Sequence, residues 1–526
     1  MPKVLISDKL SPTAVDVFRQ RGLETVYDPD LGKDPEKLAA VIGEYDGLAV
    51  RSATKVKGPV LDNAASLKVV GRAGIGVDNI DIPTATAKGV VVMNTPYGNA
   101  VTTAEHAIAM MFALARQIPQ ANESTHAGKW EKSRFMGVEL FNKTLGIVGC
   151  GNIGSIVASR ALGLKMKVVA FDPFLTPERA TELGVKKVEL DELLATADVV
   201  TLHTPLTDQT RNIISADALK EVKKGVRLVN CARGGLVDEV ALKEALDDGR
   251  VAGAALDVFE TEPATEHPLF GHERVVATPH LGAATSEAQE NVAVQIAEQM
   301  ADYLLSGAVS NALNMPSITA EEAPKLTPFL ALVEKLGLFA GQLTETGVEE
   351  IEVTFAGDVA ELNVKPLLQT AVAGVLKPML QGVNIVSAPS VAKDRGIHIA
   401  ETVTDDADGY DSMITLRVRT ERQTRTVSGV LFGGEPRIVE IKGVKIDAGF
   451  ADHMLYVTNA DKPGFIGALG GALGEAKVNI ATFNLGRDAA GGDAIALLAV
   501  DQAIAPDLIA QLSKLEHVKQ AKALAF

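Results

Sequence analysis

Short runs rich in Val, Ile and Leu alternate with segments of helical spacing from the N-terminus onward. The apolar runs predict strands, and the apolar residues of segment 12–21 recur at the period of a helix. Strands separated by helices are typical of βαβ units built around a parallel sheet. The predicted strands of this first series are residues 3–7, 47–50, 67–71 and 89–94.

Two longer helical segments flank a second series of the same kind, which runs from residue 145 to about 279. Residues 102–116 are apolar on every side, which predicts a helix buried between two domains, and Thr102 with Glu105 fits a capping box. Residues 281–305 predict a return helix. We therefore expect the first domain to be assembled from both ends of the segment that these helices delimit.

The remainder of the chain predicts a linker and two further domains. Residues 309–328 contain three prolines and an acidic stretch, which is typical of a linker. A mixture of helix and strands follows, and the last 75 or so residues show the element order β-α-β-β-α-β of ferredoxin-like domains. The expected domain bounds are 1–98 together with 284–315, then 99–283, 318–452 and 453–526.

The composition of the chain argues against several classes of function. The 526 residues include 51 Lys+Arg and 67 Asp+Glu, a net charge of −16, which argues against non-specific binding of nucleic acid. The two cysteines, Cys150 and Cys231, are too few for a disulfide framework, and no metal-binding motif is present, so we expect no metal. The apolar run 107–115 is too short to span a membrane, and the first residues already read as a strand rather than a leader. A cytoplasmic setting is expected.

A glycine-rich turn marks a dinucleotide site. Gly149, Gly151 and Gly154 fit G-x-G-x-x-G between a predicted strand at 144–148 and a predicted helix at 155–162. These glycines permit a tight turn, close approach of a pyrophosphate and close packing of helix on strand. The expected fold class is therefore α/β, with two Rossmann-like doubly wound parallel-sheet domains, an α+β intervening domain and a ferredoxin-like βαββαβ domain. A βαβ turn that holds no ligand is the alternative.

The residue at the end of the next predicted strand indicates which nicotinamide dinucleotide binds, NAD or NADP. It ends at Asp172, whose carboxylate can accept hydrogen bonds from ribose hydroxyls and would repel a 2′-phosphate. Pro173 and Phe174 follow, with no arginine to accommodate that phosphate. The sequence favours NAD over NADP.

Arg233, Glu262 and His280 each follow the end of a predicted strand, the edge at which ligands bind in open α/β sheets. Removal of a hydride from a carbinol carbon requires loss of the hydroxyl proton, and histidine is the base best matched to neutral pH. A glutamate can orient that histidine, and an arginine offers a planar fork to a neighbouring carboxylate. The three residues predict oxidation of a 2-hydroxy acid; Cys231 is interpreted as packing.

Several motifs carry a family resemblance. The stretches GCGNIG, CARGGLVD, ALDVF-x-x-EP and TPHLGAAT-x-EA resemble the signatures of D-isomer-specific 2-hydroxyacid dehydrogenases over residues 1 to about 315. RSATKV, GRAGIGVDNID and FMGVEL are similar to the members that oxidise 3-phospho-D-glycerate to 3-phosphooxypyruvate, the first step toward L-serine. The C-terminal unit resembles an ACT domain. The resemblance thus implies an NAD-dependent oxidoreductase of amino-acid biosynthesis.

The resemblance also implies roles. Arg233 would bind the substrate carboxylate and polarise its carbonyl, Glu262 would pair with His280, and His280 would be the acid/base. Arg51 and Arg72 would hold the substrate phosphate opposite Arg233, although ordinary surface salt bridges are an alternative reading of both. The positions expected around NAD are Ile75, Asn152, Ile153, Asp172, Thr204, Cys231, Ala232, Arg233, Asp257, His280, Gly282 and Ala283. Arg134 is expected to reach the substrate from a neighbouring subunit.

By the same resemblance, the ACT-like unit predicts an effector site between two subunits of a homo-oligomer, most simply a tetramer. Asn459, Asp461 and Asn479 would form it, Asp461 also fits an N-cap of the following helix, and L-serine is the expected effector. A domain used only for assembly is the alternative. Four further arginines suggest an anion site or, more simply, a solvated strand face: Arg417, Arg419, Arg422 and Arg425.

Two other functions remain open at this stage. A glyoxylate or hydroxypyruvate reductase would share the chemistry but would have no use for Arg51 and Arg72. A non-catalytic NAD-sensing protein, like the transcriptional corepressors built on the same core, would bind the cofactor without turnover. The ACT-like unit counts against the second.

Overall fold

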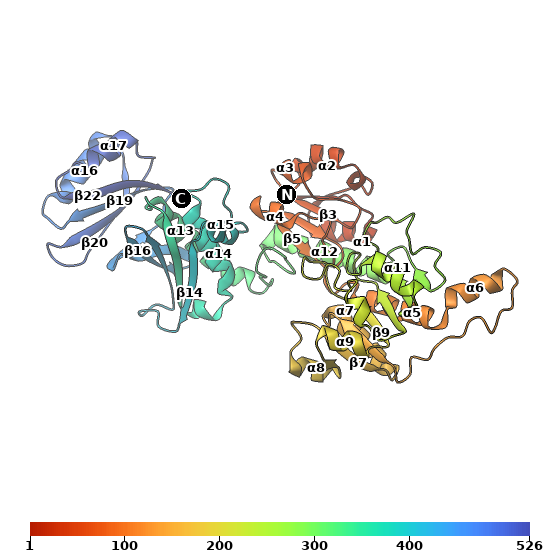
Figure 1. Cartoon of the computed structure of the whole chain (residues 1–526). Coiled ribbons are helices and arrows are strands. Elements are labelled where there is room, and N and C mark those ends of the chain that lie inside the picture. The colour runs from red at the N-terminus through yellow and green to blue at the C-terminus, as the bar shows by residue number, and fades with distance from the viewer.

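The computed structural model describes residues 1–526, whose strands form four sheets (Figure 1). The first sheet has five parallel strands in the order β2-β1-β3-β4-β5. These strands are β1 (Lys3–Ile6), β2 (Glu24–Tyr27), β3 (Gly47–Val50), β4 (Val69–Arg72) and β5 (Val91–Asn94). Between them lie α1 (Pro12–Gln20), α2 (Pro35–Val41), α3 (Pro59–Asp62) and α4 (Ile82–Ala87).

The second sheet has seven parallel strands in the order β12-β11-β10-β9-β6-β7-β8. Its strands are β6 (Thr144–Val148), β7 (Lys167–Phe171), β8 (Lys186–Lys187), β9 (Val199–Leu202), β10 (Val226–Asn230), β11 (Val251–Leu256) and β12 (Val275–Ala277). Its helices are α7 (Asn152–Gly163), α8 (Pro177–Leu183), α9 (Leu190–Thr196), α10 (Ala218–Glu221) and α11 (Glu239–Asp247). Both sheets have the parallel order that the alternating pattern predicts.

Two helices join these sheets. The chain crosses by α5 (Ala100–Arg116), followed by α6 (Ile118–His126), and returns by α12 (Ser286–Ser306), which packs on α1 and β4. The predicted capping box of Thr102 and Glu105 is wrong, because α5 already begins at Ala100 and has no side-chain cap.

The predicted start of the return helix at residue 281 is also wrong. The hydroxyl of Thr285 caps α12 by accepting the backbone N–H of Ala288 at 3.2 Å. The backbone N–H groups of Leu281 and Gly282 instead bind the side chain of Asp257, so this segment is held as a loop beside the second sheet.

The third sheet is mixed and has the order β14-β13-β15-β16-β17-β18. Its strands are β13 (Val348–Gly357), β14 (His398–Thr404), β15 (Ser412–Thr420), β16 (Thr424–Phe432), β17 (Glu435–Ile441) and β18 (Val444–Gly449). It is accompanied by α13 (Ala323–Gln342), α14 (Val364–Leu376) and α15 (Ala388–Asp394). Because α13 begins at Ala323 and contains Pro328, the predicted linker ends earlier than residue 328.

Two glycines bring α13 and α14 into close contact. A Cβ on Gly337 would lie 2.6 Å from the carbonyl oxygen of Ala371, and one on Gly374 would lie 2.8 Å from that of Glu334. A larger residue at either position would force the two helices apart.

The fourth sheet is antiparallel, in the order β20-β21-β19-β22. Its strands are β19 (His453–Ala460), β20 (Ile480–Arg487), β21 (Asp493–Val500) and β22 (Val518–Ala525), with helices α16 (Phe465–Glu475) and α17 (Pro506–Leu512). One face of this sheet packs on α13, where the rings of Phe339 and Tyr456 meet edge to face at 5.8 Å.

The predicted fold class is confirmed by the two parallel sheets, the mixed third sheet and the βαββαβ order of the last unit. The domain bounds stay predictions. None of the helices combines the length and apolarity needed to cross a membrane. Cys150 and Cys231 are both buried and free.

Candidate active site

The glycine-rich turn joins β6 to α7 and leaves room above the helix. Gly149 adopts a φ of 90°, and a Cβ on Gly154 would lie 2.1 Å from the carbonyl oxygen of Gly149. A Cβ on Gly151 would meet nothing within 4 Å. The first and third glycines are therefore required by the local packing, and the second keeps space open at the N-terminus of α7, where the amides of Asn152 and Ile153 begin the helix.

Asp172 follows the end of β7 and lies against this turn. Its carboxylate accepts the backbone N–H of Cys150 and that of Phe174, each at 2.8 Å. Each carboxylate oxygen still has a lone pair available for a ribose hydroxyl. The open turn, the helix N-terminus and the fixed carboxylate fit a dinucleotide without a 2′-phosphate.

Asp257 organises the loop after β12 rather than offering its charge to solvent. It is fully buried and accepts the hydroxyl of Thr278 at 2.6 Å, the N–H of Leu281 at 2.7 Å and the N–H of Gly282 at 2.8 Å. Burial opposes its charge, yet the hydrogen bonds from His106, Thr278 and Leu281 hold its pKa below the usual value. Asp257 thus fixes the loop that presents His280.

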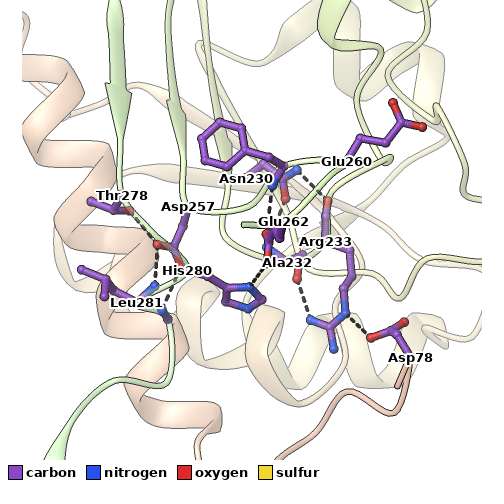
Figure 2. Close-up of polar contacts among 12 residues, drawn as sticks. Asp78, Asn230, Ala232, Arg233, Asp257, Glu260, Glu262, Thr278, His280 and Leu281 are labelled. Atoms are coloured by element: carbon purple, nitrogen blue, oxygen red, sulfur yellow. Dashed lines mark hydrogen bonds and ion pairs between the residues drawn. The ribbon is translucent and has the colours of Figure 1, made fainter. Parts of the chain in front are cut away.

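His280 and Glu262 are in direct contact (Figure 2). The imidazole Nδ1 lies 2.7 Å from Glu262 Oε2, and Glu262 Oε1 accepts the backbone N–H of Phe259 at 3.0 Å. Burial opposes the charge of Glu262, but the hydrogen bonds from His280 and Phe259 lower its pKa overall. Because an ionised carboxylate only accepts, Nδ1 carries the proton and Nε2 of a neutral ring is left to accept one.

Arg233 lies on the turn after β10 and reaches toward the first sheet. Its Nε donates to Asp78 at 3.0 Å and its Nη1 to the carbonyl oxygen of Ala232 at 2.6 Å (Figure 2). Asn230 holds the turn itself, because its Oδ1 accepts the N–H of Ala232 at 3.1 Å and its Nδ2 donates to the carbonyl oxygen of Arg233 at 2.9 Å. Sequence reasoning missed both Asp78 and Asn230.

Arg51 and Arg72 come from the first sheet and converge on Arg233. Burial, followed by the positive charges of Arg233 and Arg51, lowers the pKa of Arg72 to about 10. The Nε of Arg72 is buried without a hydrogen-bond acceptor, and Nη1 of Arg51 donates only to the carbonyl oxygen of Lys9 at 3.2 Å. Three guanidinium groups thus gather with two carboxylates, Asp8 and Asp78, which leaves a net excess of one positive charge.

Several other predicted cofactor positions of the second unit lie close to one another. A Cβ on Gly282 would lie 3.8 Å from the carbonyl oxygen of Cys231, and one on Gly149 would lie 3.0 Å from the backbone nitrogen of Thr204. The carbonyl of Ile75, across from them, accepts the side-chain N–H of Asn94 at 2.7 Å. Ala283 follows directly in the loop that Asp257 holds.

One group of side chains in this unit has the composition of a metal site. Ligand atoms of His106, Cys231 and Asp257 lie within 4.8 Å of one another. Burial, together with the charge of Asp257, raises the pKa of Cys231. His106 instead lies 3.3 Å from Asp257 Oδ1, which adds to the hydrogen bonds that hold this carboxylate.

Arg134 and the residues expected to bind an effector lie elsewhere. Arg134 pairs with Glu131 at 3.1 Å on the segment after α6, which stands away from the rest of the chain (Figure 1). Asp461 accepts Nη1 of Arg487 at 2.9 Å and the N–H of Gly491 at 3.0 Å.

Asp461 does not cap the following helix. The predicted N-cap is wrong, because α16 begins after Gly464, whose φ is 94°. The other two predicted effector residues also have partners within the chain. Asn459 donates to the carbonyl oxygen of Ala460 at 2.9 Å, and Asn479 donates to Asp501 at 2.7 Å.

Comparison with known proteins covers the whole chain. Residues 108–282 match the NAD binding domain of D-isomer specific 2-hydroxyacid dehydrogenases, residues 325–442 the D-3-phosphoglycerate dehydrogenase intervening domain, and residues 453–517 the ACT domain. A D-3-phosphoglycerate dehydrogenase of Bacillus subtilis (strain 168) is 42% identical over 525 residues, 99% of either protein. One of Archaeoglobus fulgidus is 42% identical over 523 residues, again 99% of either protein.

Among solved structures, a D-lactate dehydrogenase of Aquifex aeolicus complexed with NAD and lactic acid is similar to the first part of the chain. It is 27% identical, with a TM-score of 0.53 over 60% of this chain and 100% of its own. The two parallel sheets therefore have counterparts in a protein that binds NAD and a 2-hydroxy acid.

Proposed function

The chain belongs to the D-3-phosphoglycerate dehydrogenase family, and from this premise we propose that it oxidises 3-phospho-D-glycerate to 3-phosphooxypyruvate with NAD, the first step of L-serine biosynthesis. Relatives of this name match from end to end at 42% identity, and the NAD binding domain of the family matches residues 108–282. The enzyme is an NAD-dependent D-2-hydroxyacid dehydrogenase.

His280 is the proposed base of the reaction. The glycine-rich turn and Asp172 would hold NAD, which would supply the acceptor for the hydride of the carbinol carbon. The hydroxyl proton passes to Nε2 of His280, because Nδ1 already donates to Glu262. The carboxylate of Glu262 then stabilises the protonated ring. In the reverse direction, the same nitrogen returns the proton to the carbonyl oxygen.

Arg233 is the proposed anchor of the substrate carboxylate. Its guanidinium presents a planar pair of donors, and its hydrogen bonds to Asp78 and to the Ala232 carbonyl fix the plane of that fork. Closure of the two parallel-sheet units over a bound substrate would exclude water and align the carbinol carbon with the nicotinamide.

The observation that carries the choice of substrate is the gathering of Arg51, Arg72 and Arg233. Burial, and after it the positive charges of Arg233 and Arg51, lower the pKa of Arg72 to about 10. A three-carbon acid with a carboxylate at one end and a phosphate at the other could place the carboxylate at Arg233 and the phosphate at Arg51 and Arg72. An unphosphorylated acid would leave Arg51 and Arg72 with only backbone carbonyl acceptors, those of Lys9 and Ala73.

Replacing Arg51 by Gln should raise KM for 3-phospho-D-glycerate by a factor worth about 1.5–3 kcal/mol, the range for a hydrogen bond to a charged group. Turnover of D-glycerate, which lacks the phosphate, should be unchanged. Steady-state kinetics with both acids test this, with Arg19→Gln as the control, because Arg19 is an exposed arginine of α1.

An unchanged KM for the phosphorylated acid would favour a glyoxylate or hydroxypyruvate reductase instead. NAD binding without turnover of any 2-hydroxy acid would favour the non-catalytic NAD sensor. The two alternatives are therefore distinguished by the same assay.

We further propose that the enzyme is a homo-oligomer, most simply a tetramer, and acts in the cytoplasm. Large apolar side chains are exposed on α6 and on the segment after it: Ile118, Trp130, Met136 and Phe141. Exposed apolar surface of this kind is typical of a protein–protein contact. A second copy covering it would also bring Arg134 toward a neighbouring substrate site. Cell fractionation of the producing organism tests the cytoplasmic setting.

The ACT domain supports an amino-acid effector, and we propose L-serine. Asn459, Asp461 and Asn479 lie where the first strand and first helix of this unit end, and Asn479 is exposed. Calorimetric titration of the full chain should show binding of L-serine but not of D-serine. Sedimentation of the full chain should give the mass of an oligomer. Asn479→Ala should abolish the heat, whereas Asn63→Ala, on the first parallel-sheet unit, should not. Binding that survives Asn479→Ala would refute this site.

A further inference from the structure

Glu262 reaches His280 from a short loop that follows β11. We call residues 257–262 the Glu262 loop. Its start is fixed, because the backbone N–H of Asp257 donates to the carbonyl oxygen that ends β10 at 2.9 Å. The side chain of Glu260 points away from His280 (Figure 2). The backbone of Glu260, and not its charge, therefore bears on the position of Glu262.

Glu239 holds that backbone from the first turn of α11. Its Oε1 accepts the backbone N–H of Glu260 at 2.9 Å, and its Oε2 lies 2.7 Å from Nε2 of His267. Asp238 caps the helix by accepting the N–H of Ala241 at 3.0 Å, so Glu239 starts from a fixed position. Both oxygens of one carboxylate are thus used, one on the Glu262 loop and one on an imidazole.

His267 is locked in tautomer and in orientation. Its Nδ1 accepts the backbone N–H of Leu269 at 3.3 Å, so Nε2 carries the proton and donates it to Glu239. The ring lies 5.0 Å from that of Phe259 and 5.3 Å from that of Phe270, and the two phenyl rings meet edge to face at 5.2 Å. His267 therefore contacts the Glu262 loop twice, through Glu239 and through the side chain of Phe259.

The other side of the loop lies against the turn that carries Arg233. A Cβ on Gly234 would lie 1.9 Å from the carbonyl oxygen of Phe259, so the two backbones are in contact. The loop can move away from this turn but not toward it. The turn itself has separate support, because Asn230 binds the backbone of Ala232 and of Arg233. A displaced loop would thus move Glu262 and leave Arg233 in place.

The contact between Glu262 and His280 needs such support. These two side chains are 33% and 49% exposed, and an exposed ion pair holds its own geometry only weakly. The side chains of Glu239 and His267 are 17% and 11% exposed. The shielded pair is the firmer of the two, and the backbone N–H of Phe259, which binds Glu262 at 3.0 Å, connects them.

We propose that Glu239 and His267 are positioning residues of the reaction. Together they hold the Glu262 loop against the turn of Arg233 and keep Glu262 within hydrogen-bond reach of His280. This role rests on the proposed function, in which His280 is the base. Neither side chain hydrogen-bonds to His280, so the pair acts through Glu262.

A second pair at the other end of α11 provides a matched control. Nδ1 of His272 accepts the backbone N–H of Arg274 at 3.1 Å, and its Nε2 lies 3.3 Å from Oδ1 of Asp247. The local geometry repeats that of His267, but Asp247 makes no hydrogen bond to the Glu262 loop and pairs with Lys243 at 2.7 Å. His272→Gln should therefore leave kcat and KM unchanged.

Glu239→Gln is the first test. The amide keeps the volume of the side chain and an oxygen for the N–H of Glu260, but it turns an N–H group toward the proton of His267. This variant should lower kcat for 3-phospho-D-glycerate oxidation by about 10–100-fold, the cost of a misplacement of about 1 Å, and change KM by less than about twofold. KM should be spared because Arg233 keeps its own support.

His267 variants test the same step from the other partner. His267→Leu should lose kcat to a similar extent, and His267→Gln, which still offers a donor to Glu239, should lose less. Unchanged kcat in both Glu239→Gln and His267→Leu would overturn the proposal, as would a loss that appears in KM alone.

A double-mutant cycle separates positioning from a general structural role. In the Glu262→Gln background, Glu239→Gln should lower kcat by less than about twofold further, because the charge that it positions is already gone. An equal loss in both backgrounds would mean that Glu239 only stabilises the fold, and would overturn the proposal.

Hydrogen–deuterium exchange reads the loop without turnover. The peptide that covers residues 257–262 should exchange faster in Glu239→Gln than in the wild type, and at the wild-type rate in His272→Gln. Equal rates in Glu239→Gln and the wild type would contradict the proposed positioning whatever the substrate is. A wild type that does not oxidise 3-phospho-D-glycerate would instead contradict the proposed function, so the two failures are distinguishable.

Discussion

Replacing His280 by Asn should lower kcat for 3-phospho-D-glycerate oxidation by about 10²–10⁴-fold, the range for loss of a positioned general base. The imidazole is the group that can accept the hydroxyl proton, because its Nδ1 is committed to Glu262 at 2.7 Å and its Nε2 is left free. NAD affinity should change little, since the glycine-rich turn and Asp172 are untouched. Stopped-flow measurement of NADH formation checks the expected loss of kcat, and fluorescence titration with NADH checks the expected cofactor affinity.

Glu262→Gln is the matched control for this prediction. The amide fills the same space and can still accept the N–H of Phe259, but it carries no charge to stabilise a protonated ring. We expect a smaller loss of kcat than for His280→Asn. The acid limb of the pH–rate profile should move to lower pH, because the protonated ring has lost its anionic neighbour. A profile identical to the wild type would mean that Glu262 only holds the loop.

The sequence predicts much of this site because its chemistry is local to strand ends. Arg233, Glu262 and His280 each follow an apolar run, and parallel strands bring their carboxyl ends to one edge whatever lies between them. The glycine-rich turn is similarly local, since Gly149 and Gly154 are required by a single strand–turn–helix unit.

What the sequence does not predict depends on partners distant along the chain. Asp78, in the loop after β4 of the other parallel-sheet unit, contacts Arg233 from 155 positions away, and no spacing in the sequence predicts that contact. Asn230 could have been suspected, because a polar residue that ends an apolar strand is unusual, but its hydrogen-bond partners are backbone atoms of a turn. The burial of Arg425 on β16 is not predicted for the same reason, because its neighbour Tyr456 belongs to the C-terminal unit.

The errors at helix starts have the same origin. Residues 281–285 have helical spacing, yet Asp257 binds the N–H groups of Leu281 and Gly282 and holds them outside α12. Asp461 has the chemistry of an N-cap, yet Arg487 and the N–H of Gly491 compete successfully for its carboxylate. An N-cap hydrogen bond stabilises a helix by about 1 kcal/mol. Hydrogen bonds from a charged side chain and from a second backbone N–H together contribute more than this, so they decide where the carboxylate lies.

Replacing Arg233 by Gln should lower kcat/KM for 3-phospho-D-glycerate by about 10²–10³-fold, the cost of removing one preorganised donor from a developing charge. Arg233 is held for this task on both sides, by Asp78 from the loop after β4 and by the Ala232 carbonyl within its own turn. Arg233→Lys keeps the charge but loses the planar fork, so it should recover only part of the loss.

Comparing Arg233→Gln with Arg233→Lys separates the contribution of the positive charge from that of the planar guanidinium. The comparison requires that the turn after β10 keeps its conformation in both variants. Asn230 fixes the turn through the backbone of Ala232 and Arg233, so the substitutions should leave it folded and NAD binding intact. Arg227→Gln, at the opposite end of β10, controls for loss of an arginine from the same strand. If Arg233→Gln kept more than about a tenth of kcat/KM, the carboxylate would have to be held by another cation. Arg72, whose own charge is repelled by Arg233, would then be the group to test.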